Sequence, residues 1–435
     1  MFVAISPSLL IADDAIRQSI KALPARYWDF ASADTKEWTH GYHSYPAMMI
    51  PQIARGLIAI VQRHQPGIRS LFDPFMGSGT SLVEGLLAGL TVVGSDLNPL
   101  SRLITQAKTT AWDPDALQFW AETLTDYVKG VRTSETDRPQ FRNMTFWFKP
   151  AVITDLARIK QSIETVIPEE FRPFFWVAFS DTVRWVSNSR NTEFKLYRLD
   201  ETRLAQWNPD VLRTFRKVIA RNQIGNARLW ERRPLPPVSL YAYNAMDLSA
   251  LPDETLDLMV TSPPYGDSRT TVAYGQFSRL SLEWLNLVET SEGPSPNKLD
   301  QAMLGGLASN ELHHTLPSET LTAALNQIAH HDSGRARDVL SFYQDLDVTL
   351  REIARVMRPG GYQCWVVGNR TVKNVKLLTD RIITELSERH GLVPVVNFTR
   401  TIPNKRMPKE NSPSNQVGAK VATMNGEQIF ILRKN

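Results

Sequence analysis

Short apolar runs that end in polar or turn-forming residues recur along the chain. Runs of this kind indicate buried strands, and they lie at 70–73, 91–95, 239–243, 256–260, 362–367, 393–398 and 428–432. Apolar residues at helical spacing predict helices between them, at 51–58, 81–88, 274–285, 342–357 and 375–389. The alternation predicts an α/β protein, a sheet with helices on both faces.

The segment 110–237, between the second and third predicted strands, has a different pattern. It predicts helices at 114–131 and 150–166 and contains an aromatic-rich stretch at 171–185. A chain of 435 residues exceeds the usual size of a single core. We therefore expect a largely helical insertion at 110–237 in an α/β domain formed by 1–109 and 238–435.

The fourth predicted strand ends in a stiff turn, Thr261-Ser262-Pro263-Pro264-Tyr265. Two consecutive prolines fix φ twice and remove two backbone donors, so the carbonyls of the turn are free for a ligand. A hydroxyl before the prolines and an aromatic ring after them suit a planar ring that carries an amino group. An ordinary proline-rich strand exit is the alternative reading.

A second turn follows the first predicted strand, and its sequence is Asp73-Pro74-Phe75-Met76-Gly77-Ser78-Gly79-Thr80. Glycines let the backbone approach a ligand closely, and the helix that follows begins with unpaired N–H groups. No lysine follows the last glycine, so the turn is not a phosphate loop. Asp73 favours a ligand with a cationic group. The candidate cofactor-binding residues here are Asp73, Pro74, Phe75, Gly77, Ser78, Gly79 and Thr80.

Acids also follow the next two predicted strands. Asp96 lies about 20 residues beyond the glycines, where a ribose diol would sit, and Asn98 comes two residues later. A helix N-cap is the alternative role for Asp96. The third strand leads to Asp247, which we assign to the adenine side of a cofactor.

Together the two turns resemble the amino-methyltransferases of DNA, which transfer a methyl group from S-adenosylmethionine to an exocyclic base nitrogen. The glycine turn is similar to the cofactor motif of that family, and 261–265 is similar to its catalytic motif in the form usual for N4-cytosine enzymes. The resemblance covers roughly 38–110 and 238–435 and implies a Rossmann-like class I methyltransferase sheet. One departure is the long insertion between the second and third strand ends.

The resemblance implies a catalytic set of Ser262, Pro263, Pro264 and Tyr265, S-adenosyl-L-methionine as cofactor and double-stranded DNA as substrate. The target cytosine would be flipped out of the duplex and stacked on Tyr265. A cognate restriction endonuclease is a candidate partner. The alternatives left open are an N6-adenine enzyme, an RNA methyltransferase and a catalytically silent nucleic-acid-binding protein.

Two segments carry groups that suit DNA. Phosphates attract basic side chains, and Asn and Arg make bidentate contacts with bases. The candidate DNA-binding residues are Asn188, Arg190, Lys195 and Tyr197 in the insertion, and Lys405 and Arg406 near the C-terminus. Solvated charged surfaces are the alternative for both segments.

Composition adds few constraints. The net charge of +4 permits nucleic acid as a partner without identifying it. One cysteine, Cys364, excludes disulfides within the chain, and its apolar surroundings predict a buried thiol. We expect no metal site. No apolar run is long enough to span a bilayer and no secretory signal is evident, so a cytoplasmic protein is expected.

Overall fold

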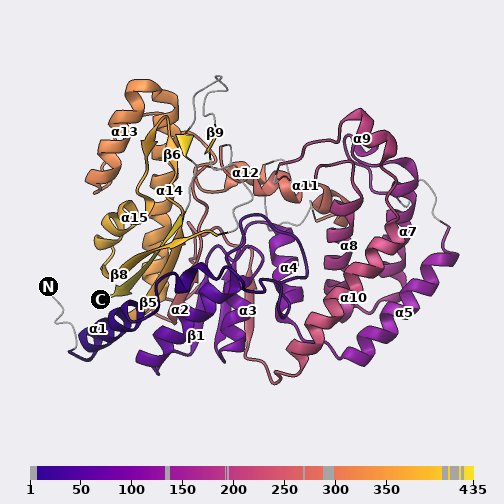
Figure 1. Ribbon diagram of the computed structural model, residues 1–435, viewed down its shortest axis with the longest axis horizontal. Helices are drawn as coiled ribbons and strands as arrows, with labels where there is room; N and C mark the ends of the chain where they lie inside the picture. The colour runs from indigo at the N-terminus through magenta and orange to yellow at the C-terminus, as the bar shows by residue number, and fades with distance from the viewer. Residues whose placement is uncertain are drawn as a thin grey trace.

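A seven-stranded sheet forms the centre of the computed structural model, with strand order β3-β2-β1-β4-β5-β11-β8 (Figure 1). The strands are β1 (Ser70–Asp73), β2 (Thr91–Ser95), β3 (Val238–Tyr241), β4 (Leu256–Thr261), β5 (Met357–Val367), β8 (Leu392–Thr401) and β11 (Gly426–Lys434). The structure describes residues 7–132, 138–191, 193, 195–267, 270–287, 298–403, 410–411, 421–422 and 426–435.

The direction of the strands places a crevice at the middle of the sheet. Strands β3, β2, β1, β4 and β5 are parallel, whereas β11 runs antiparallel to both of its neighbours, β5 and β8. The chain moves outward from β1 to β3 and then returns to β4, which pairs with β1. Ligands of open α/β sheets bind at such a reversal, at the carboxyl ends of the strands. The predicted α/β, Rossmann-like fold is confirmed.

Helices cover both faces of the sheet (Figure 1). One face packs against α1 (Pro7–Lys21), α2 (Pro51–His64) and α3 (Thr80–Leu87), and the other against α13 (Glu319–His331), α14 (Ser333–Val356) and α15 (Thr379–Glu388). Because strand side chains alternate, Val260 and Cys364 belong to the first core, and Met259 and Trp365 to the second. Cys364 is buried, as predicted.

The segment after β2 forms a separate group of helices beside the sheet, which stands on the right in Figure 1. It contains α5 (Pro114–Gly130), α6 (Met144–Trp147), α7 (Pro150–Val166), η3 (Glu169–Phe171), α8 (Arg172–Val186), α9 (Glu201–Gln206) and α10 (Val211–Trp230). Apart from α9, these helices share a third core with α4 (Pro99–Thr109) and α11 (Tyr274–Leu285). Asp113 and Asp210 accept hydrogen bonds from the first turns of α5 and α10, which is why those helices begin there.

A buried polar cluster joins these helices to the segment that precedes α2. His43 donates through Nδ1 to the carbonyl of Ser44 and accepts through Nε2 from the hydroxyl of Ser180 in α8, at 2.8 Å. Arg221 of α10 and the amide of Ser44 both donate to Asp181, at 3.1 Å. Burial lowers the pKa of His43 to about 4, so it is a neutral structural histidine.

Two predicted boundaries were wrong. The strand predicted from Tyr362 begins at Met357, because 358–361 belong to β5, which pairs with β4 through an irregular register and has Gly360 at φ 80°. The helix predicted from Val375 begins at Thr379, because β6 (Thr371–Val372) and β7 (Val375–Lys376) pair first.

The remaining elements are short: η1 (Tyr27–Asp29), α12 (Leu299–Ala302), β9 (Glu410–Asn411) and β10 (Val421–Ala422). Among the described residues, no helix combines the length and apolar character that a membrane span needs.

Candidate active site

A pocket of about 820 Å³, open to solvent, lies at the carboxyl ends of β1, β2, β3 and β4. The turns after β1 and β2 contribute Asp73, Pro74, Phe75, Gly77, Ser78, Thr80 and Asp96 to its lining. The opposite walls include Tyr45, Met48, Asn244, Tyr274, Met303 and Leu304. Ser262 and Pro264, from the turn after β4, line the same pocket. The fold therefore brings together two turns that lie far apart in the sequence.

The glycine turn has a backbone that other residues adopt poorly. Gly77 has φ 49° and Gly79 has φ 76°, and a Cβ on Gly79 would lie 2.8 Å from the side chain of Thr105. The hydroxyls of Ser101 and Thr105 donate to the carbonyl of Gly77, which holds the turn against α4. Gly79 itself lies behind the pocket, at the N-cap of α3.

Asp73 joins the glycine turn (73–80) to the Pro-Pro turn (261–265). Its Oδ1 accepts from the backbone N–H of Phe75 at 3.0 Å and from the hydroxyl of Thr261, the last residue of β4, at 2.6 Å. Burial raises the pKa of Asp73 to about 7, although these hydrogen bonds favour the carboxylate. A carboxyl with a pKa near 7 is only partly ionised at neutral pH, and it becomes fully ionised when a cation binds nearby.

Asp96 closes the other side of the glycine turn. Its Oδ2 accepts from the N–H of Gly77 at 3.0 Å and its Oδ1 from the N–H of Asn98 at 2.8 Å. Burial raises the pKa of this carboxyl as well. Asn98 is the N-cap of α4, and its amide lies 3.1 Å from the hydroxyl of Tyr45, so it holds an aromatic wall of the pocket from behind. The cap that the sequence suggested for Asp96 is thus made by Asn98.

The Pro-Pro turn presents its groups to different sides. Ser262 faces the pocket, whereas Pro263 and Tyr265 are not among its lining residues. The hydroxyl of Tyr265 lies 3.1 Å from Ser262 Oγ and donates to Glu427 of β11 at 2.9 Å. Burial and the charge of Glu427 raise the pKa of Tyr265 well above its ordinary value, so this phenol stays protonated.

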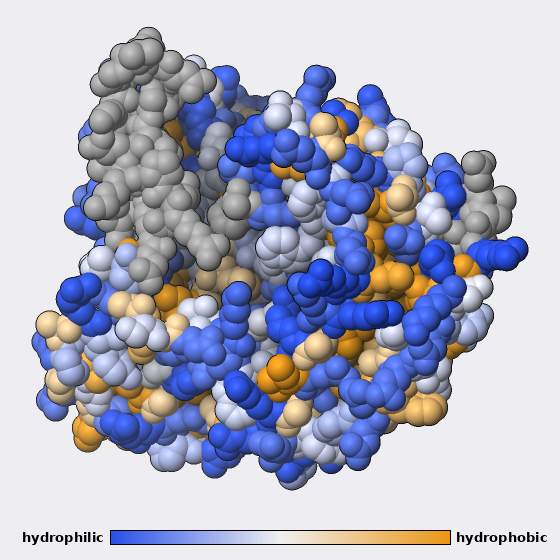
Figure 2. Space-filling view, turned by 45° about the vertical axis from the view of Figure 1, so that its right-hand side comes forward, coloured by the Kyte–Doolittle hydropathy of each residue, from blue (hydrophilic) through white to orange (hydrophobic). Residues whose placement is uncertain are grey.

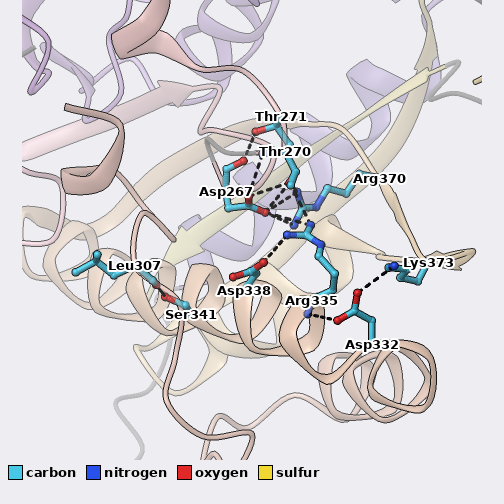
Figure 3. Close-up of polar contacts among 10 residues, drawn as sticks. All are labelled: Asp267, Thr270, Thr271, Leu307, Asp332, Arg335, Asp338, Ser341, Arg370 and Lys373. Atoms are coloured by element: carbon cyan, nitrogen blue, oxygen red, sulfur yellow. Dashed lines mark hydrogen bonds and ion pairs between the residues drawn. The ribbon is translucent and has the colours of Figure 1, made fainter. Parts of the chain in front are cut away.

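Ion pairs hold the backbone directly after Tyr265 (Figure 3). Buried Asp267 accepts from Thr270, and its Oδ2 lies 3.3 Å from both terminal nitrogens of Arg370 and 3.5 Å from Arg335. Although burial opposes ionisation, Arg370, Thr270 and Arg335 hold the pKa of Asp267 below its ordinary value. Arg370 also packs on Gly266, where a Cβ would lie 2.1 Å from Nη1. The loop that carries the Pro-Pro turn is therefore fixed at both ends.

Not every predicted cofactor residue reaches the pocket. Asp247 does not line it; the residue is exposed, and its carboxylate accepts from the N–H of Ser249 in a turn. Asn244, three residues after the end of β3, takes the place near the strand end. Sequence reasoning preferred the acid, but the direction in which β3 ends selects the amide.

Several lining residues were missed by the sequence analysis. They are aromatic and apolar residues from segments without a motif, namely Tyr45, Tyr274, Met48, Met303 and Leu304. The rings of Tyr45 and Tyr274 stack with centroids 5.9 Å apart. Tyr274 begins the predicted helix at 274–285, which was the one usable signal, while nothing local distinguished Met303 and Leu304.

The predicted DNA-binding residues divide into two groups. Asn188 is buried and donates its amide to the carbonyl of Phe146. Arg190 and Tyr197 are exposed on two segments joined by a hydrogen bond of 2.7 Å from Arg190 N to Tyr197 O, and Lys195 is half-buried. Lys405 and Arg406 lie outside the described residues.

The sheet, its reversal point and the acid-flanked glycine turn define an α/β protein with a pocket at the place where such sheets hold nucleoside-type ligands. No family model matches the chain. The chain is 45% identical over 431 residues to the type II methyltransferase M.MvaI of Kocuria varians, and the match covers 94% of each protein. The chain therefore belongs to the type II methyltransferase family.

Two further matches are more limited. The type II methyltransferase M.MjaII of Methanocaldococcus jannaschii is 32% identical over 96 residues, which are 21% of this chain and 18% of that protein. The solved rRNA methyltransferase aviRa from Streptomyces viridochromogenes covers 94% of this chain and 96% of its own, at 11% identity. The TM-score of this match is 0.37.

Replacing Asp267 with Asn should destabilise the protein, because Arg370 and Arg335 would face each other without their shared buried carboxylate. We expect the free energy of unfolding to fall by about 3 kcal/mol, as when one partner of a buried ion pair is removed. Urea denaturation followed by tryptophan fluorescence measures this change.

Asp338→Asn is the matched control, because it removes a second carboxylate from Arg335 and leaves Asp267 in place. A loss below about 1 kcal/mol is expected for this more exposed pair. Equal losses in the two variants would contradict the role of Asp267 as the brace of the loop.

Proposed function

We propose that the protein is a site-specific DNA methyltransferase that transfers the methyl group of S-adenosylmethionine to the exocyclic N4 of cytosine in duplex DNA. It would act as the modification enzyme of a restriction-modification system, with a restriction endonuclease as its partner. The observation that carries the proposal is the single pocket lined by both the glycine turn and Ser262. Membership of the type II methyltransferase family supports it.

The pocket fits the proposed cofactor by its charge. Its described lining contains the carboxyls of Asp73 and Asp96 but no Lys, Arg or His. Such a lining favours a cationic ligand and disfavours the phosphates of a dinucleotide. Asp96, at the end of β2, would accept hydrogen bonds from a ribose diol, and Asn244 and Phe75 would border the adenine. Asp73 would face the charged methionine end.

The mechanism follows from the weak nucleophilicity of the target nitrogen, whose lone pair is delocalised into the cytosine ring. Ser262 Oγ and the Pro263 carbonyl would accept its two N–H groups and hold the nitrogen so that its lone pair faces the pocket. When bound, S-adenosylmethionine supplies a methyl group activated by a sulfonium. Positioning and exclusion of water would provide most of the acceleration. Because alkylation acidifies the nitrogen, a strong general base is unnecessary.

The choice of base rests on the sequence of the catalytic turn. Ser262 stands where the resembling enzymes that act on adenine N6 usually carry Asp. Adenine N6 is the second candidate, because its amino group lies beside a similar ring acceptor. The flipped base would stack on Tyr265, outside the cofactor pocket.

DNA would approach from the side on which the Pro-Pro turn is open. Figure 2 shows a hollow near the middle of one face, surrounded mostly by hydrophilic residues. We propose that exposed Arg190 and Tyr197, with Lys195, contact the DNA backbone or bases from the helical part. Asn188 would instead support this segment from inside.

Sequencing of methylated bases in DNA from cells that express the protein tests the proposed function. We expect N4-methylcytosine at one short recognition sequence and none in cells with an empty vector. N6-methyladenine at a fixed sequence would select the second candidate, and unmodified DNA would refute both.

Replacing Ser262 with Ala should lower the rate of methyl transfer by about 100-fold, because the amino group loses an acceptor needed in the transition state. Donor affinity should change little, since the glycine turn is untouched. Single-turnover transfer and calorimetric titration with S-adenosylmethionine measure the two effects. Ser249→Ala, in an exposed turn, is the control, and retention of full activity in Ser262→Ala would contradict the assignment.

Donor affinity should rise with pH between about 5.5 and 7. In the free protein Asp73 has a pKa of about 7, and a cationic ligand binds its ionised form, so binding releases a proton. The change approaches about tenfold per pH unit below that pKa. Asp73→Asn should bind more weakly and lose this dependence when titrated by calorimetry at several pH values. If donor affinity rose equally with pH in the wild type and in Asp73→Asn, Asp73 would not be the group whose ionisation is coupled to binding.

A further inference from the structure

A chain of polar contacts leads from Ser262 away from the cofactor pocket. Ser262 Oγ lies 3.1 Å from the Tyr265 hydroxyl, which lies 2.9 Å from Glu427 Oε1. Glu427 Oε2 accepts from Arg400 Nη1 at 2.8 Å. Glu427 and Arg400 pair across β11 and β8, two strands without a motif. This series of polar contacts therefore links the turn after β4 to β11 and β8.

Each hydroxyl in this series of contacts has one proton, and this determines which atom donates in each hydrogen bond. An ionised carboxylate only accepts, so the single proton of the Tyr265 hydroxyl points to Glu427. The Tyr265 oxygen can then only accept from its other neighbour, and the proton of Ser262 must point to it. Ser262 Oγ is left with free lone pairs and no free proton.

Arg400 secures the charge at the far end. Its side chain is 2% exposed, and Glu427 is its partner in an ion pair. Among the described residues, neither Nε nor Nη2 of Arg400 has a hydrogen-bond partner. The ion pair with this buried guanidinium holds the Glu427 carboxylate in place behind Tyr265.

We propose that Glu427, held by Arg400, is a positioning residue that makes Ser262 a pure hydrogen-bond acceptor for the amino group of the target base. This inference rests on the proposed function and adds a specificity role to it. An acceptor at this position attracts the 4-amino group of cytosine and repels the 4-keto oxygen of uracil.

The Glu427→Gln variant tests the inference, because an amide can donate to Tyr265 and allow the whole chain to reverse. The substrates are unmethylated duplexes that contain the recognition sequence of the enzyme, with cytosine or uracil at the target position. We expect single-turnover methyl transfer to fall about 10- to 100-fold, with donor affinity within about twofold of wild type. The preference for the cytosine duplex over the uracil duplex in competition binding should fall by a similar factor, which a purely structural defect would not produce.

Glu385→Gln is the matched control. Glu385 in α15 also accepts from hydroxyls, those of Ser318 and Thr320, and pairs with Arg381, yet it lies outside the site. It should show wild-type transfer and preference. A Glu427→Gln variant with wild-type rate and cytosine preference would overturn the inference while leaving the proposed function intact.

A second measurement does not need activity. In protein with labelled tyrosine, the Tyr265 hydroxyl proton should give a slowly exchanging downfield NMR signal, assigned by its loss in Tyr265→Phe. Glu427→Gln should shift this signal upfield, whereas Glu385→Gln should not. An unchanged signal would refute the proposed proton order even if wild type transferred no methyl group, an outcome that would refute the proposed function separately.

Discussion

The hydrogen bond between Asp73 and Thr261 is the contact on which the site depends. It joins the end of β1 to the end of β4, two strands that are adjacent in the sheet although 188 residues separate the bonded pair. The bond is buried, so breaking it would leave the hydroxyl of Thr261 without this acceptor and would remove one hydrogen bond from the carboxyl of Asp73. Its consequence is that the glycine turn and the Pro-Pro turn keep a fixed separation across one pocket.

Electrostatics divides the neighbourhood of Ser262 into two parts. On the cofactor side, the described lining carries two buried carboxyls with raised pKa values and no basic side chain. On the other side, Glu427 and Arg400 form a buried ion pair that reaches Ser262 through Tyr265. The first arrangement suits a cation that arrives and leaves, and the second suits a permanent orientation of hydroxyl groups. The sulfonium donor and the neutral amino acceptor of the proposed reaction would need these two environments.

The helical part is tied to the same pocket by its own polar contacts. His43 and Ser44 lie just before Tyr45, a wall of the pocket, and they bond to Ser180 and Asp181 of α8. Because the cluster is buried and the pKa of His43 is about 4, these contacts persist without a charged imidazole at neutral pH. Exposed Arg190 and Tyr197 lie in the segment between α8 and α9. If this surface contacts DNA, the polar contacts of α8 would hold it at a fixed position relative to the pocket.

The sequence by itself determined those helices and turns that depend only on residues close together in the chain. The proline at the start of α7 and its apolar spacing fixed 150–166, and the glycines of the turn after β1 required positive φ at Gly77 and Gly79. The alternation of apolar runs and helical segments was sufficient to predict the α/β sheet, and the two motifs contained residues, such as Asp73 and Ser262, that line one pocket at its middle. Boundaries that depend on pairing, such as β6 with β7, were not predictable from local pattern.

Only the tertiary structure decided which side chains complete the site. Asn244 rather than Asp247 reaches the pocket because β3 ends in that direction, and Glu427 reaches Tyr265 because β11 inserts between β5 and β8. Asn188 turned inward for the same kind of reason, a carbonyl of Phe146 that lies close only in the fold. Local sequence records propensity and turn chemistry, whereas these contacts depend on distances between segments far apart in the chain.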